Sequence, residues 1–146
     1  MKGSTDRGFS SSDNHHRSHV HALFHLCSYM FCSLPWICDL LVECCYGLRD
    51  TSTLLHDQDP YVTLEYATTT VRTQVCRGKG RDPIFKQKFV LTLVDGHQEI
   101  GVLVWNKNTV VEDYLIGTAR VPLETVLLCG SDDNLWALQF AGRYAS

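Results

Sequence analysis

The sequence predicts an all-β protein, an antiparallel β-sandwich built from short strands. Apolar and polar residues alternate with a period of two in several segments after Trp36, as in strands that bury one face. Turn-forming residues separate these segments, which recur roughly every ten to eighteen residues. The chain has 146 residues, 45% of them apolar and 20% charged, which suits one ordinary hydrophobic core.

Each predicted strand has its own pattern. Val62, Leu64 and Tyr66 alternate with polar neighbours, whereas the segment 100–105 is apolar on both faces and reads as a buried strand. No segment has a convincing helical period, although 123–128 fits one or two helical turns. In chain order, the predicted strands are 40–48, 61–67, 70–75, 85–93, 100–105, 115–123 and 135–140.

The N-terminal part does not follow this pattern. Residues 1–19 are mostly polar and small, and residues 18–38 contain no Asp, Glu, Lys or Arg, although histidines and Pro35 interrupt the apolar run. We expect residues 1–35 to form a disordered or loosely packed extension, with the folded domain spanning 36–146. A membrane segment and a targeting signal are the alternatives.

Histidines and cysteines suggest possible metal sites, but neither set forms a recognisable ligand pattern. Five histidines lie between His15 and His25, and we expect a solvated tract, although two pairs at helical spacing could suit a transition metal. The cysteine count is odd and no CxxC pair occurs, which favours a reduced, cytoplasmic chain over a disulfide scaffold or a zinc site. The cysteines are Cys27, Cys32, Cys38, Cys44, Cys45, Cys76 and Cys129.

Charge is distributed unevenly along the chain. The formal net charge is −3, which argues against a globally basic nucleic-acid binder. One stretch is nevertheless strongly basic and is opposed only by Asp82, so it could attract an anionic membrane surface. The alternative is a solvated strand face that resists aggregation. The basic residues are Arg72, Arg77, Lys79, Arg81, Lys86 and Lys88.

Catalysis is not predicted. The sequence has no glycine-rich phosphate loop and no GxSxG nucleophile motif. His56 lies beside Asp57 and Asp59, but no candidate nucleophile stands at a defensible position relative to it.

The order of the motifs resembles that of a C2 domain, and the match looks closest to small single-domain C2 proteins of plants. Two motifs carry the resemblance: Asp-Pro-Tyr-Val at 59–62, and WNKNTVVEDYLIG at 105–117. The resemblance covers about 40–146. Because the sequence stops at GRYAS, where this family continues into a last strand, we expect seven of eight strands and marginal stability.

The resemblance also implies a ligand and a function. Calcium prefers six to eight oxygen ligands on flexible loops, and the family's ligand spacing falls on Asp59, Asn106, Asn108 and Asp113. Asp50 and Asp57 are candidates to replace a missing first-loop ligand, since Thr53 stands at that position. We therefore expect weak calcium binding or none.

The expected function is peripheral binding of anionic phospholipid membranes through the basic strand face, with the protein cytoplasmic and membrane-associated. The alternative is a calcium-independent protein-interaction module.

Overall fold

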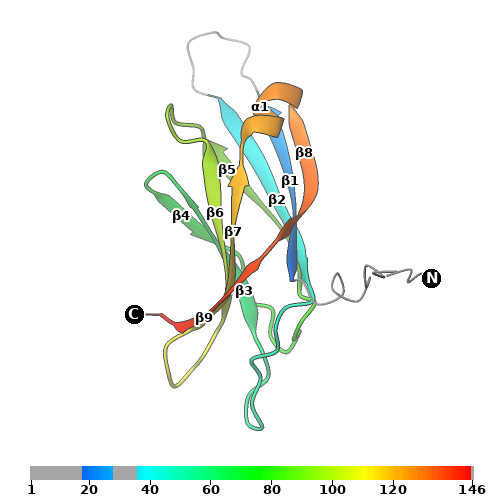
Figure 1. Cartoon of the computed structure of the whole chain (residues 1–146), viewed down its shortest axis with the longest axis vertical. Helices are drawn as coiled ribbons and strands as arrows, with labels where there is room; N and C mark the ends of the chain where they lie inside the picture. Colours follow the sequence, from blue (N-terminus) through cyan, green and yellow to red (C-terminus); the bar gives the residue numbers. More distant parts are fainter. Residues whose placement is uncertain (1–17, 28–35, 146) are drawn as a thin grey trace, which may run out of the picture.

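The structure is a computed structural model that describes residues 18–27 and 36–145. Within these ranges the chain forms two antiparallel β-sheets, packed face to face around one core, and one short helix (Figure 1). The predicted antiparallel sandwich is therefore confirmed.

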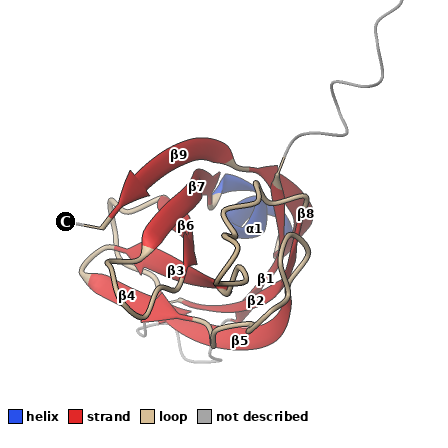
Figure 2. Ribbon diagram, turned by 90° about the horizontal axis from the view of Figure 1, so that it is seen from below, coloured by secondary structure: helices blue, strands red, loops and turns tan. Residues whose placement is uncertain are grey.

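The two sheets have the strand orders β5-β2-β1-β8 and β4-β3-β6-β7-β9 (Figure 2). Over the described residues the strands are β1 (His19–Cys27), β2 (Ile37–Tyr46), β3 (Pro60–Tyr66), β4 (Thr69–Arg72), β5 (Ile84–Thr92), β6 (Glu99–Asn106), β7 (Tyr114–Pro122), β8 (Ser131–Ala137) and β9 (Gln139–Tyr144).

The core explains why the alternating segments form strands. Every second side chain of β2 and β6 points between the sheets, including Leu40, Val42, Val102 and Val104, and each of these is almost fully buried. An alternating sequence can bury one face of a strand only in an extended conformation, because a helix would distribute the same residues around its axis.

Strand β1 is the main difference from the expected fold. It lies between β2 and β8 and is antiparallel to both, with Leu23 opposite Leu41 on one side and Asp133 on the other. Val20 and Phe24 of β1 are 1% exposed and belong to the core. The expectation of a seven-stranded sandwich is therefore wrong, because the described residues form nine strands and β1 pairs with the backbones of both β2 and β8.

The position of β1 also moves the domain boundary. The boundary expected at residue 36 is too late, because 19–27 is an integral part of the sheet. The expectations for 1–17 and 28–35 lie outside the described residues. In the described part of the chain, no helix is long and apolar enough to cross a membrane.

The C-terminal third contains two smaller features. The predicted helical turns appear as α1 (Glu124–Cys129), which ends at Gly130 with φ of 84°, a left-handed conformation that favours glycine. The predicted strand 135–140 is divided at buried Leu138, where the chain leaves the four-stranded sheet and enters the five-stranded one. The backbone N–H of Leu138 donates to the carbonyl oxygen of Ser18 (2.8 Å), which fixes this crossing beside the start of β1.

The core role of β1 gives a stability prediction. Phe24→Ala should lower the free energy of unfolding by about 3–5 kcal/mol, because it removes a fully buried aromatic ring from the centre of the core. His25→Ala, at the exposed neighbouring position, should change it by less than about 0.5 kcal/mol. Denaturant unfolding of both variants measures the difference, and equal stabilities would contradict the assignment of β1 to the core.

Candidate functional site

Three loops meet at one end of the sandwich, and the site is built from them (Figures 1 and 2). Loop 1 (47–59) joins β2 to β3, loop 2 (73–83) joins β4 to β5, and loop 3 (107–113) joins β6 to β7. Two contacts of Asp59 connect them: its carbonyl oxygen accepts from the backbone N–H of Lys107 (2.9 Å), and its Oδ1 accepts from that of Gly78 (2.7 Å). A residue from loop 1 thus holds loops 2 and 3 in place.

Asp59 carries the first of two half-buried carboxylates at this end. Besides the bond from Gly78, its Oδ2 lies 3.9 Å from Nη1 of Arg77. Its own backbone N–H donates to Oδ1 of Asn106 (2.8 Å). The carboxylate of Asp59 therefore already has two partners from loop 2, the guanidinium of Arg77 and the backbone N–H of Gly78.

Asp113 is the second carboxylate, and its side chain is 15% exposed. Its Oδ1 accepts from the backbone N–H of Asn108 (3.0 Å), and its Oδ2 accepts from the Tyr61 hydroxyl and lies 3.6 Å from Nζ of Lys107. Burial alone would raise the pKa of Asp113, but these hydrogen bonds and the ammonium group outweigh burial and lower it. The pKa of Tyr61 is raised by burial and by its bond to this carboxylate.

The structure brings most of the predicted calcium ligands together. Asn106 and Asn108 lie beside Asp59 and Asp113 through the bonds just described, and the amide of Asn108 also donates to the carbonyl oxygen of Glu112 (2.8 Å). Asp57 lines the same small cavity as Asp59. In the described part of the chain, Asp50 forms no hydrogen bond with this set. It lies at the root of loop 1, where its carboxylate accepts from the backbone N–H of Ser52 (2.9 Å), and it lines a cavity of about 440 Å³ together with Asn106 and Asn108.

These groups fit a divalent ion poorly. No three His, Cys, Asp or Glu side chains in the described ranges are grouped so that they could hold a metal ion. Calcium needs several carboxylates to offset its charge. Here Asp59 and Asp113 already interact with Arg77 and Lys107, and an incoming cation would have to displace those groups or share the carboxylates with them.

The loop tips carry four exposed apolar residues that the sequence analysis missed. Leu54 is fully exposed and Leu55 is 85% exposed at the tip of loop 1, while Val110 is 86% exposed at the tip of loop 3, next to exposed Val111. A cavity of about 80 Å³ lies between the two loops, lined by 56–57 and 59 on one side and 107–111 on the other. The available signal was a pair of adjacent apolar residues within each of two otherwise polar loops.

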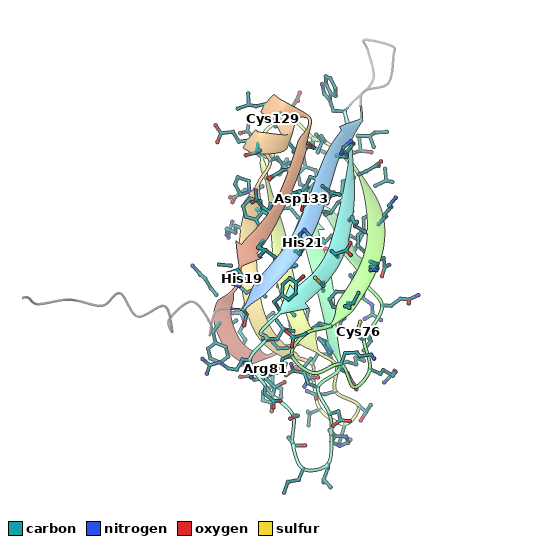
Figure 3. The ribbon with its side chains drawn as sticks, turned by 90° about the vertical axis from the view of Figure 1, so that its right-hand side faces the viewer. His19, His21, Cys76, Arg81, Cys129 and Asp133 are labelled. Carbon is teal, nitrogen blue, oxygen red and sulfur yellow. The ribbon has the colours of Figure 1, made fainter. Side chains whose placement is uncertain are left out.

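The predicted basic residues do not form one strand face. Arg72 ends β4, at the edge of the five-stranded sheet, with its guanidinium carbon 5.3 Å from the centre of the Tyr61 ring. Lys86 and Lys88 are exposed on β5, at the edge of the other sheet. The remaining three, Arg77, Lys79 and Arg81, lie on loop 2, and Figure 3 shows Arg81 at the loop end.

The environment of Asp113 predicts a pH dependence. Its folded pKa lies below the ordinary value of about 3.9, so its contribution to stability is present above that value and is lost as the pH falls through the folded pKa. Asp113→Asn should therefore lower the free energy of unfolding at pH 7 by about 1.5–3 kcal/mol, the range for hydrogen bonds to a charged group. The deficit should shrink as the pH falls from the ordinary carboxyl pKa of about 3.9 through the lower folded pKa of Asp113.

Denaturant unfolding at several pH values measures this effect. Glu112→Gln is the control, because it changes the same charge at the exposed neighbouring position. A deficit that stays constant from neutral to acidic pH would show that the Asp113 carboxylate is not stabilised by its partners.

Comparison with known proteins relates this chain to a small plant protein by sequence. The chain is 34% identical over 85 residues to the 16 kDa phloem protein 2 of Arabidopsis thaliana, an alignment that covers 58% of this chain and 57% of that protein. The chain thus spans little more than half the length of this relative. The expected resemblance to small plant C2 proteins is confirmed.

Two solved structures show the same fold at 16% sequence identity. The third C2 domain of the KIAA1228 protein has a TM-score of 0.65 and covers 99% of this chain and 98% of that one. A C2 domain of RIM from Drosophila has a TM-score of 0.62, with 83% and 98% covered. C2 domains are generally binding modules that commonly bind membrane lipids and calcium. A family model described as "C2 domain" matches residues 38–137, and the chain belongs to the C2 domain family.

Proposed function

We propose that this protein binds anionic phospholipid membranes peripherally, from the cytoplasm, with weak calcium dependence or none. The observation that carries this proposal is the pair of exposed apolar side chains at the tip of each of two loops that share one end of the sandwich, namely Leu54 and Leu55 on loop 1 and Val110 and Val111 on loop 3. Exposed apolar patches with polar rims are typical of interaction surfaces. Here basic residues of the neighbouring loops form part of the rim.

Two physical terms would act together at this end. Full burial of an aliphatic side chain of this size contributes about 1.5–3 kcal/mol. Even partial burial of these four side chains among the lipid acyl chains would therefore contribute substantially to the free energy of binding. Each Lys or Arg close to an anionic membrane adds about 1 kcal/mol. Arg77 and Lys79 of loop 2 and Lys107 of loop 3 are placed to supply this second term.

The weak role of calcium follows from internal charge compensation. In a site that depends on calcium, the carboxylates repel one another and the anionic membrane until the ion binds. Here Arg77 lies beside Asp59 and Lys107 beside Asp113, so the two negative charges already have cationic partners. The loop end therefore does not need an ion before it can approach an anionic surface.

The proposal gives a direct test of the tips. Leu54→Asp with Val110→Asp should reduce co-sedimentation with phosphatidylserine-containing liposomes at least about tenfold, because both tips would then carry charge into the lipid. The matched control is Val90→Asp with Leu135→Asp, two residues on β5 and β8 that are 67% and 55% exposed and lie outside the loops.

The control pair should bind nearly as well as the unchanged protein. If it loses binding while the tip pair keeps it, the membrane proposal in this form fails in favour of a surface on the four-stranded sheet. If the unchanged protein ignores liposomes of every composition, the alternative of a calcium-independent protein-interaction module gains support.

Calcium provides a second test. EDTA should not release the protein from liposomes, and millimolar calcium should raise the thermal midpoint little, as expected for a Kd of about 10⁻³ M or weaker. Arg77→Gln with Lys107→Gln should strengthen calcium binding, seen as a larger calcium-induced shift of the midpoint, because it removes both cationic partners of the carboxylates. Lys86→Gln with Lys88→Gln makes the same change in net charge on β5, outside the loops, and should leave the shift unchanged. Release by EDTA would contradict the proposal.

A further inference from the structure

A second cavity lies at the roots of the loops, apart from the carboxylate set. Its volume is about 460 Å³, and it lies where the start of β1, the root of loop 1 and the crossing from β8 to β9 meet. The backbone at Gly47 and Gly117 and the side chains of Ile116 and Leu138 form part of its wall. Two arginines also line it, Arg49 and Arg81, neither of which forms a salt bridge with a carboxylate in the described part of the chain.

Arg49 is held by an aromatic ring rather than by an acid. Its guanidinium carbon lies 3.9 Å from the centre of the Phe140 ring, a close stacking distance. Stacking engages the flat face of a guanidinium and leaves its N–H groups, which point outward in the plane, available to acceptors. Arg49 therefore presents an oriented set of hydrogen-bond donors beside the cavity.

Arg81 is fixed in a complementary way. Its Nε–H donates to the carbonyl oxygen of Leu48 (2.8 Å), which leaves the two terminal nitrogens free of that bond. Figure 3 shows Arg81 at the loop end, below His19 at the start of β1. Asp50 is the one carboxylate that lines the cavity among the described residues, and it is directed to the backbone N–H of Ser52 (2.9 Å).

A second acid, Asp82, lies beside the wall of the cavity, because its carboxylate accepts from the backbone N–H of Gly47 (2.9 Å). Hydrogen bonds from Ser52 and the charge of Arg81 lower the pKa of Asp50. Two acids therefore lie near the two arginines, and the case for an anionic ligand rests on the orientation of the guanidinium donors rather than on net charge.

We propose that this cavity binds a phosphate monoester through the guanidinium groups of Arg49 and Arg81. A monoester carries a charge of about −1.5 to −2 and three terminal acceptor oxygens, so it can accept from two guanidiniums at once. A phosphodiester has only two such oxygens and one charge. The apolar wall accommodates the carbon atoms attached to the phosphate.

The position of the cavity favours a lipid as the source of the phosphate. A neighbouring cavity of about 440 Å³ shares Arg49, Asp50 and Phe140 with it and extends to Val111, at the tip of loop 3. A membrane that contacts the loop tips would thus place its lipid headgroups at the opening of these two neighbouring cavities. The choice of a lipid rests on the proposed function, whereas the phosphate site itself does not.

The first experiment tests the site without a membrane. Glycerol 3-phosphate, titrated into the ¹⁵N-labelled protein, should shift the backbone amide signals of Gly47, Arg49 and Gly117, and dimethyl phosphate should shift them much less. Arg49→Gln with Arg81→Gln should weaken glycerol 3-phosphate binding at least about tenfold, since it removes both charged donors. If the double variant does not fold, Arg49→Lys serves instead, because it keeps the charge but loses the planar fork.

The second experiment identifies the source of the phosphate. Vesicles of phosphatidylcholine contain either phosphatidic acid or phosphatidylserine, matched for surface charge. The unchanged protein should prefer phosphatidic acid, and Arg49→Gln with Arg81→Gln should abolish that preference. Lys86→Gln with Lys88→Gln, which removes the same charge from β5, should weaken both kinds of binding equally.

The outcomes separate the two proposals. Binding of glycerol 3-phosphate without any vesicle binding supports the cavity with a soluble ligand and overturns the membrane function. Vesicle binding without preference, together with unshifted amide signals in glycerol 3-phosphate, overturns the cavity and leaves the membrane function standing. A phosphate response that survives the arginine substitutions also overturns the site.

Discussion

The hydrogen bonds of β1 to both β2 and β8 are the constraint on which the rest of the molecule depends. Without β1, each neighbour would expose an unpaired edge, and the core would lose the aromatic ring of Phe24. The start of β1 also braces the loop end, because the Ser18 hydroxyl donates to the carbonyl oxygen of Gly47 (2.8 Å) and the Ser18 carbonyl accepts from Leu138. The strand that completes the sheet thereby fixes the walls of the cavity beside Arg49 and Arg81.

Charge compensation distinguishes this loop end from a simple acidic pocket. Arg77 and Lys107 lie beside the two half-buried carboxylates, and Tyr61 donates to one of them. Because burying an unpaired carboxylate is costly, these partners allow loops 1 and 3 to approach each other closely. The same cations also face the solvent at the loop end. In the proposed membrane function, one set of side chains would therefore support both the folding of the loops and the attraction of an anionic surface.

The sequence was informative where one strand or one motif decides the outcome. Alternating residues predicted the core strands, and the two family motifs grouped Asp59 with Asn106, which lie side by side at the end of loop 1 and the end of β6. The sequence did not predict features that depend on which strands are neighbours in the sheets, such as the role of 19–27 and the grouping of the basic residues. The histidines on β1 made 19–27 look too polar for a core strand, yet Val20, Ala22 and Phe24 fill its inward face while His19, His21 and His25 stand on the outward one. The strand order likewise separated Lys86 and Lys88 from Arg72, since β5 and β4 belong to different sheets.

In the proposed membrane complex, the side chains of the loop end would act at different distances from the lipid surface. The four apolar side chains at the two loop tips would lie outermost. Their contribution to the binding free energy would depend on burial of apolar area, which moderate salt affects little. The cations behind them act through an electrostatic field that falls off over about 10 Å at 0.1 M salt. Arg49 and Arg81 lie deeper, at the loop roots, where short charge-assisted hydrogen bonds depend more on geometry than on screening. Under the two proposals, membrane affinity would come mainly from the loop tips and the exposed cations, whereas discrimination between headgroups would require the oriented guanidinium groups at the loop roots.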